Sequence, residues 1–283
     1  MSALKLQGLL RLFRFELPFA AGVCVVLGEI LAYGKIPGAS QVILGFLSIF
    51  LISASALILN DYFDIETDKI NAPERPLPSG LVTEREALAL AGMVTLLGSI
   101  LAWMISTVAL WVVILTWVTG FLYNWRFKKA GFVGNLMVTF SVGMTFIFGG
   151  IAVGRPLEKI VWVFALMVML VDLGEEIAAD AMDMEGDCQA GSRSLAVLYG
   201  REKALKISAV IFFLVIVTSL VPFFCGWLDW IYLFPLLMMD AVILYATRKL
   251  LDENVANKRK YIRWIYLSGS AALVIFIVIR SFR

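Results

Sequence analysis

Nine apolar stretches follow one another along this chain of 283 residues, and they constrain its fold more than any other feature. Each has roughly the 20 mainly apolar residues that an α-helix needs to cross a bilayer. They lie at residues 16–33, 42–60, 86–104, 108–124, 134–153, 161–178, 204–224, 230–247 and 263–280. Only 16% of the residues are charged, against about a quarter in an ordinary soluble domain. The sequence therefore predicts an all-α integral membrane protein with about nine transmembrane helices, with a tight hairpin at "MISTVALW" between the third and the fourth.

Lysine and arginine are distributed unevenly between the two sides of the predicted membrane domain. With nine spans, nineteen of the 24 basic residues lie on the side of the N-terminus and five on the other. Cytoplasmic loops of membrane proteins carry an excess of Lys and Arg. We therefore expect a multi-pass protein of the cell membrane with its N-terminus and long loops in the cytoplasm. The net charge of +2 is too small to indicate a nucleic-acid partner.

The sequence contains no histidine, so the usual general base and the commonest metal ligand are missing. Its three cysteines, Cys24, Cys188 and Cys225, are odd in number and lack the spacing of a metal site. Any chemistry must therefore use carboxylates, hydroxyls, cations and bound metal ions.

An aspartate pattern, D-x-x-D-x-x-x-D, occurs twice on the predicted cytoplasmic side. The first copy, Asp61, Asp64 and Asp68, follows the second span, and the other, Asp180, Asp183 and Asp187, follows the sixth. An arginine comes seven residues after the first copy and six after the second, at Arg75 and Arg193. This internal repeat indicates a single domain of residues 1–283 built from two related halves, about 1–125 and 126–283, that face one another across a central cavity.

Carboxylates at helix positions i, i+3 and i+7 share one face, so each triad aims three anions in one direction. Such anions repel one another unless cations lie between them, and Mg²⁺ binds carboxylate oxygens together with the phosphate oxygens of a substrate. We therefore expect the two triads to hold Mg²⁺ ions that bridge a diphosphate. Arg75, Arg193 and Lys128 or Lys129 are the cations expected to neutralise it.

A diphosphate bound beside an apolar membrane cavity is typical of an isoprenyl diphosphate. Metal ions stabilise the departing pyrophosphate, and an aromatic face stabilises the allylic cation that it leaves behind. Tyr123, at the cytoplasmic end of the fourth span, lies at the level where that cation would form.

Other roles stay open for several of these residues. Tyr123 and Trp125 also fit an interfacial aromatic belt, and "RFKK" also fits a topology signal. Asn60 is as well placed to cap the second span as to bind a ligand. Glu175 and Glu176, on the sixth span, are equally suited to packing and to substrate contact.

The motifs as a set resemble the UbiA superfamily of intramembrane prenyltransferases. The resemblance is carried by "NDYFDIETD" for the first aspartate motif, "DAMDMEGD" for the second, and "LYNWRFKKAGFVGN" between them, and with the nine spans it covers essentially the whole chain. It implies a ring of helices around a central cavity, dependence on Mg²⁺, and transfer of a prenyl group from its diphosphate to an acceptor.

The resemblance also implies roles for individual residues. Those implied to bind metal and diphosphate are Asn60, Asp61, Asp64 and Asp68 in the first motif and Asp180, Asp183 and Asp187 in the second. Lys128 corresponds to a lysine that contacts the diphosphate, and Tyr123 to a tyrosine near the reacting carbon. Arg75 and Arg193 correspond to residues of the loops that cap the cavity, and Arg14 to an early arginine that binds substrate.

Within the superfamily the sequence most resembles archaeal enzymes of ether-lipid synthesis, which implies a geranylgeranyl donor and geranylgeranylglyceryl phosphate as the acceptor. Those relatives are expected to carry basic residues before the second triad, where this chain has Glu175, Glu176 and Ala179. An aromatic acceptor of the quinone-precursor kind, resembling 4-hydroxybenzoate, therefore stays open.

Two other classes of membrane protein are weighed against the enzyme. A transporter also has repeated halves and acidic helix ends, but its ion site lies near the midplane, whereas both triads here lie at one face. A CDP-alcohol phosphotransferase would need a glycine after the second aspartate of its motif, and Ile65 and Met184 occupy those positions.

Overall fold

The structure is a computed structural model that describes residues 3–281, and every regular element in that range is helical. The long helices are α2 (Glu16–Tyr33), α3 (Ala39–Phe63), α5 (Glu84–Ile105), α6 (Thr107–Leu122), α7 (Phe132–Ala152), α8 (Lys159–Gln189), α10 (Arg201–Phe224), α11 (Leu233–Leu251) and α12 (Arg259–Ser281). The short elements are α1 (Ala3–Leu12), α4 (Ile65–Asn71), α9 (Leu195–Tyr199), the π-helical turn η1 (Tyr123–Phe127) and the 3₁₀ turn η2 (Trp230–Tyr232). The all-α prediction is confirmed.

Eight helical segments within residues 3–281 are long and apolar enough to cross a membrane. They are α2, α3, α5, α6 with η1, α7, α10, η2 with α11, and α12. The sixth predicted span, 161–178, lies within α8, which is 31 residues long but carries Asp172, Glu175 and Glu176 inside that stretch. The multi-pass architecture is therefore established, while the count of nine spans stays a prediction.

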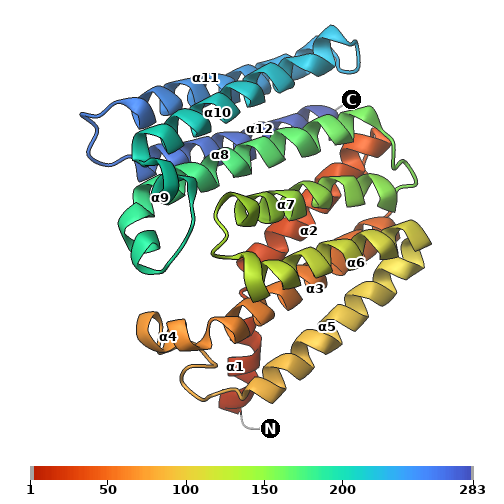
Figure 1. Cartoon of the computed structure of the whole chain (residues 1–283). Helices are drawn as coiled ribbons and strands as arrows, with labels where there is room; N and C mark the ends of the chain where they lie inside the picture. The colour runs from red at the N-terminus through yellow and green to blue at the C-terminus, as the bar shows by residue number, and fades with distance from the viewer. Residues whose placement is uncertain (1–2, 282–283) are drawn as a thin grey trace.

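The helices form one continuous bundle in which α7 and α8 are neighbours (Figure 1). On one side of this junction α3 packs against α2 and α5, and α2 packs against α7. On the other side α8 packs against α10 and α12, and α12 packs against α11. The short helices α4 and α9 lie at the same end of the bundle (Figure 1), and these two helices adjoin the two aspartate motifs.

The predicted hairpin between the third and fourth spans is present and contains a single residue outside the helices. Helix α5 ends at Ile105, α6 begins at Thr107, and Ser106 between them accepts a hydrogen bond from the Ala109 N–H at 3.1 Å. The side chain of Ser106 thus caps α6, satisfying an N–H that would otherwise lack a partner in the bilayer.

Helices α2 and α7 pack so closely that only glycine fits at two positions of their contact. A β-carbon added to Gly28 would lie 2.3 Å from the Phe146 carbonyl oxygen, and one added to Gly149 would lie 2.2 Å from that of Val25. Small residues allow helix backbones to approach in this way within a membrane. The contact fixes α7, which carries one wall of the site described below.

Candidate active site

The first aspartate motif spans a break between two helices. Asp61 lies in the last turn of α3, Asp64 follows the end of α3 with φ −94° and ψ 3°, and Asp68 lies in α4. Asp61 and Asp68 are almost completely buried, with 2% and 6% of their surface exposed. The expectation that one continuous helix face presents all three carboxylates is therefore wrong for this motif, because the chain bends at Asp64.

Each aspartate of the first motif is paired with a cation from elsewhere in the chain. Arg14 donates a hydrogen bond to Asp61, and Lys128 donates one to Asp64. The guanidinium of Arg75 lies 2.6 Å from Asp68 and 3.7 Å from Asp61. These pairs neutralise carboxylates that would be costly to bury as free charges.

Two details show that these cations are held in place. Burial alone lowers the pKa of Arg75, but its hydrogen bond to Asp68 and the charges of the neighbouring aspartates outweigh this and raise the pKa above its ordinary value. Arg14 has φ +43°, a left-handed conformation that non-glycine residues rarely adopt, and among residues 3–281 it is the one non-glycine residue that does so. Strain of this kind is often found at functional sites.

The sequence suggested that the second aspartate motif lies in a loop after the sixth span. In the structure it lies on a continuous helix. Asp180, Asp183 and Asp187 all belong to α8, which continues to Gln189. Asn135 of α7 donates a hydrogen bond to Asp180 at 2.9 Å, and Arg259 at the start of α12 donates one to Asp183. Since the spacing is that of one helix face, the three carboxylates point in a similar direction.

The loop between η1 and α7 connects the two motifs. Lys128 in this loop holds Asp64, and the carbonyl of the next residue, Lys129, accepts a hydrogen bond from the Arg193 N–H at 3.1 Å. Gly131, with φ +63°, lies so close to this segment that an added β-carbon would be 1.9 Å from the Arg193 carbonyl oxygen. The loop therefore fixes the segment after the second motif against the residue that contacts the first.

Tyr123 lies between the motifs. The carboxylates near its hydroxyl are Asp64 of the first motif, Asp180 of the second, and Glu176 one turn before Asp180. Its ring also packs near Gly134, where an added β-carbon would lie 3.5 Å from the tyrosine ring. Tyr123 thus lies between the two motifs, and its role near the reacting carbon stays a prediction.

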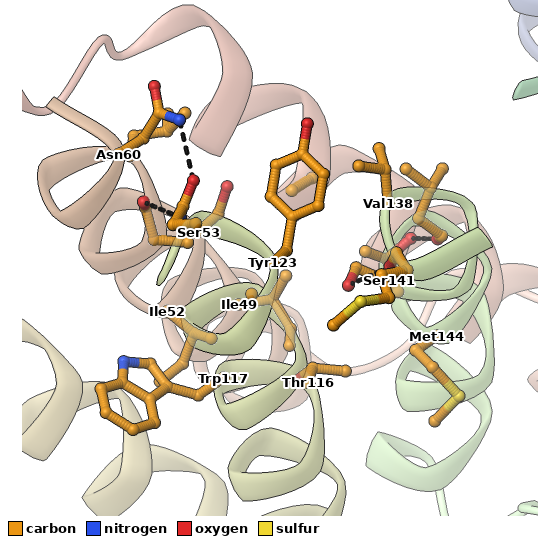
Figure 2. A pocket seen from close by; sticks show the side chains of 18 residues that line it. Ile49, Ile52, Ser53, Asn60, Thr116, Trp117, Tyr123, Val138, Ser141 and Met144 are labelled. Carbon is orange, nitrogen blue, oxygen red and sulfur yellow. Dashed lines mark hydrogen bonds between the residues drawn. The ribbon is translucent and has the colours of Figure 1, made fainter. Parts of the chain in front are cut away.

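A mainly apolar cavity of about 310 Å³ opens beside Tyr123. Its walls come from α3, α6, η1 and α7, with Ala21 of α2. Figure 2 shows the Tyr123 ring between Asn60 and Ser53 on one side and Val138 and Ser141 on the other. The cavity extends along α3 from Asn60 to Ile49, which at 1.5 Å per residue is about 16 Å.

Asn60 lines the mouth of this cavity and is oriented by a second asparagine. Its side-chain amide donates to the Asn124 Oδ1 at 2.8 Å, and the Asn124 amide donates to the Ala56 carbonyl at 3.1 Å. Asn124 lies in the π-helical turn η1, an irregularity frequently found at functional sites. Sequence reasoning singled out Asn60 but missed Asn124.

The structure brings together most of the residues predicted for the site. The backbones of Arg193 and Lys129 bond to each other near the motifs, but their side chains are exposed and form no hydrogen bond or ion pair with another described side chain. The partner of Asp183 is Arg259, not Arg193, and it was missed because it lies 76 residues from Asp183 among basic residues typical of a topology signal. Asn135 was missed because no charge marks it.

The aspartates are chemically suited to Mg²⁺, although the described residues contain no group of three or more carboxylates, thiols or imidazoles close enough to hold a metal ion by themselves. Mg²⁺ normally takes one or two carboxylates and completes its shell with water and substrate phosphate. All the candidate ligands are hard oxygen donors, and in this structure cations already occupy the positions next to Asp61, Asp64, Asp68 and Asp183. The residues therefore fit an ion that arrives together with a diphosphate.

Comparisons with known proteins place these features in a family. The model of the UbiA prenyltransferase family matches residues 21–277. The digeranylgeranylglyceryl phosphate synthase of Thermococcus kodakarensis is 36% identical over 262 residues, which is 91% of this chain and 92% of that protein. The enzyme of the same name from Methanopyrus kandleri is 36% identical over 227 residues, covering 80% and 82% of the two chains.

Solved structures show the same fold. A digeranylgeranylglyceryl phosphate synthase structure matches with a TM-score of 0.88 and 30% identity over 99% of both chains. A UbiA homologue from Archaeoglobus fulgidus bound to GPP and Mg²⁺ matches with a TM-score of 0.69 over 98% of this chain and 100% of that one. At 16% identity the second match supports the fold alone.

Proposed function

Because this chain belongs to the UbiA prenyltransferase family and is a multi-pass membrane prenyltransferase, we propose that it transfers a geranylgeranyl group from its diphosphate to the hydroxyl of geranylgeranylglyceryl phosphate. The observation that carries this proposal is the position of Tyr123, which lines an apolar cavity and lies near an aspartate of each motif. A bound diphosphate would lie at the motifs, with its hydrocarbon chain in the cavity and the reacting carbon beside Tyr123.

The motifs supply the diphosphate site. Mg²⁺ held by Asp61, Asp64, Asp68, Asp180, Asp183 and Asp187 would act as a Lewis acid that stabilises the leaving pyrophosphate. Arg14, Arg75 and Lys128, which pair with the aspartates in the structure, would turn to the phosphate oxygens when the metal ions take the carboxylates. Asn60, held by Asn124, lies at the cavity mouth and would orient the diphosphate.

The cavity supports a long donor chain. An extended isoprene unit is about 5 Å long and four units about 20 Å, from carbon–carbon bonds of about 1.5 Å. The cavity is about 16 Å deep along α3, so it accommodates three of these units. The fourth unit would extend past the far end of the cavity. The apolar wall also keeps water from an allylic cation formed beside Tyr123.

The acceptor is proposed from the names of the relatives together with two unpaired cations. Lys129 and Arg193 are exposed near the motifs without a side-chain partner among the described residues, so both are available for a phosphate monoester. An acceptor without phosphate, such as 4-hydroxybenzoate, is the second candidate, because Glu175 and Glu176 line the same helix before the second motif.

We also propose that the motif-bearing end of the bundle faces the cytoplasm, since most basic residues lie there.

One assay tests the proposal. Purified protein in detergent is incubated with radiolabelled geranylgeranyl diphosphate and Mg²⁺, with either geranylgeranylglyceryl phosphate or 4-hydroxybenzoate. A labelled ether product that forms with the first acceptor and disappears with EDTA is the expected result. Product with 4-hydroxybenzoate alone would overturn the acceptor, and no product with either would overturn both.

A further inference from the structure

The second aspartate motif is the outer part of a longer row of carboxylates on α8. Asp172, Glu176, Asp180, Asp183 and Asp187 follow one another at intervals of three or four residues, which places them on one face of the helix. On α8 no basic residue accompanies them after Lys159. The row of carboxyl groups therefore continues from the motif into the part of α8 that corresponds to the sixth predicted span.

Asp172, Asp180 and Asp183 of this row each have a side-chain partner, whereas in the described part of the chain Glu176 and the outermost member, Asp187, do not. Thr139 donates a hydrogen bond to Asp172 at 2.9 Å, Asn135 donates one to Asp180 at 2.9 Å, and Arg259 pairs with Asp183. Within residues 3–281 no side chain or backbone N–H donates to the carboxylate of Glu176, which is only partly exposed. A half-buried carboxylate without a donor costs free energy, so a structural role does not account for it.

Glu176 also lies near the proposed reaction centre, on a different side from the donor chain. The apolar cavity is walled by α2, α3, α6, η1 and α7, and no residue of α8 lines it. Tyr123 belongs to that wall, and its ring packs near Gly134 of α7. The next residue, Asn135, donates to Asp180, which lies one turn of α8 from Glu176. With the chain in the cavity and the diphosphate at the motifs, the side of Tyr123 that faces α8 is left for the acceptor.

Transfer to a hydroxyl requires a base at that place. The acceptor oxygen forms a bond to C1 of the prenyl group, the bond from C1 to the diphosphate oxygen breaks, and its electron pair leaves with the pyrophosphate. The hydroxyl proton must then go to a nearby group. Histidine is absent from the sequence, and the six motif aspartates are assigned to the metal ions, so Glu176 is the available carboxylate beside Tyr123.

We propose that Glu176 is a catalytic residue that binds the acceptor hydroxyl by a hydrogen bond and accepts its proton as the new C–O bond forms. This inference rests on the proposed function, since it assumes a hydroxyl acceptor. It assigns a role to one of the two glutamates that the sequence left open between packing and substrate contact. Glu175, one position along the helix, is not on the row defined above.

The test compares Glu176→Gln with Glu176→Asp and with Glu185→Gln in the full-length protein in detergent. Gln keeps the shape of Glu but cannot take the proton, and Asp keeps a base on a shorter side chain. Glu185 is a matched control, because it lies on the same helix with 87% of its side chain exposed and 3.8 Å from Arg201. Ether formation and binding of geranylgeranyl diphosphate with Mg²⁺ are measured for each.

For Glu176→Gln we expect kcat for ether formation to fall about 100-fold or more, the usual contribution of a general base, while donor affinity changes less than about twofold. Retained donor binding also shows that the variant is folded. Glu176→Asp should recover part of the lost kcat, and Glu185→Gln should behave like the unmodified protein.

Two results would overturn this role. Near-normal kcat in Glu176→Gln would show that another group takes the proton, and an equal loss in Glu176→Asp together with weakened donor binding would show a structural role. No ether from the unmodified protein with either acceptor would instead overturn the proposed function, and this inference with it.

Discussion

Lys128 donates a hydrogen bond to Asp64 across 64 residues of sequence, joining the loop after η1 to the bend between α3 and α4. The next residue, Lys129, contacts the Arg193 backbone instead. One loop thus reaches the first motif and the segment that follows the second motif through adjacent residues. The structure pairs Lys128, and not Lys129, with a motif aspartate, which is the lysine that the family resemblance had pointed to.

Replacing Lys128 by Ala should weaken donor binding, and replacing Lys129 should weaken acceptor binding. A hydrogen bond to a charged group is worth about 1.5–3 kcal/mol, so the KM for geranylgeranyl diphosphate should rise at least about tenfold in Lys128→Ala. In Lys129→Ala the KM for the phosphorylated acceptor should rise and that for the donor should stay. Steady-state kinetics with each substrate varied in turn measures both, and identical effects from the two variants would contradict the assignment.

Replacing Asp64 or Asp183 by Asn should nearly abolish transfer. Loss of a metal ligand removes several kcal/mol of charge stabilisation, so kcat should fall about a thousandfold. The Mg²⁺ concentration needed for half activity should rise in the same variants. Glu66→Gln is the control, because Glu66 adjoins the first motif but is exposed and pairs with Lys69. If Asp64→Asn kept its activity and its Mg²⁺ requirement, the first motif would not hold the metal.

Replacing Arg259 by Ala should tighten Mg²⁺ binding, an effect opposite in sign to the loss of a ligand. Arg259 competes with the metal for Asp183, and the pair is largely exposed, with 65% and 50% of the two side chains accessible. An exposed ion pair contributes about 0.2–1 kcal/mol, so the gain should be no more than about fivefold. Isothermal titration with Mg²⁺ in the presence of pyrophosphate measures it. Lys260→Ala is the control, since Lys260 lies over the ring of Tyr261, and weaker binding in Arg259→Ala would refute the competition.

The cavity should set the preferred length of the donor chain. Thr116 lines its far part, whereas Thr119, three residues later on the same helix, does not line the cavity and has a solvent-accessible hydroxyl. Both hydroxyls donate to backbone carbonyls of the preceding turn, at 3.0 and 2.9 Å. Thr116→Phe should therefore raise the KM for geranylgeranyl diphosphate about tenfold more than it raises the KM for a shorter donor. Thr119→Phe should leave the ratio of these two KM values unchanged. Competition between labelled donors of two lengths measures the preference in both variants.

Sequence patterns predicted the helices well because apolar stretches of span length have few alternatives in a bilayer. The first span was expected at 16–33, and α2 has those bounds. The break at Asp64 and the cations that pair with the first motif were not predicted, because Arg14 and Lys128 come from distant parts of the chain. The extension of α8 through the second motif was missed because its charged residues are typical of a loop.

The candidate site was predictable where charge marks it and not where neutral or distant partners complete it. Six aspartates and Tyr123 stand out from their apolar surroundings in the sequence. Asn124 and Asn135 do not, and they become visible only as the donors and acceptors that hold Asn60 and Asp180. Arg259 lies among three other basic residues, and only the fold shows which one reaches the motif.

The contact between α2 and α7 should be the part of the bundle least tolerant of added volume. Gly149→Ala would place a methyl group 2.2 Å from the Val25 carbonyl, so the helices would have to separate. Overpacking of this kind costs about 1–3 kcal/mol.

Gly92 lies on α5 with nothing within 4 Å of an added β-carbon, so Gly92→Ala should leave stability unchanged or raise it by up to about 1 kcal/mol. Thermal unfolding of both variants in the same detergent measures the difference, and equal melting temperatures would show that α2 and α7 do not meet as closely as the structure places them. Because α7 carries Asn135 and the Val138 and Ser141 wall of the cavity, Gly149→Ala should also lower kcat.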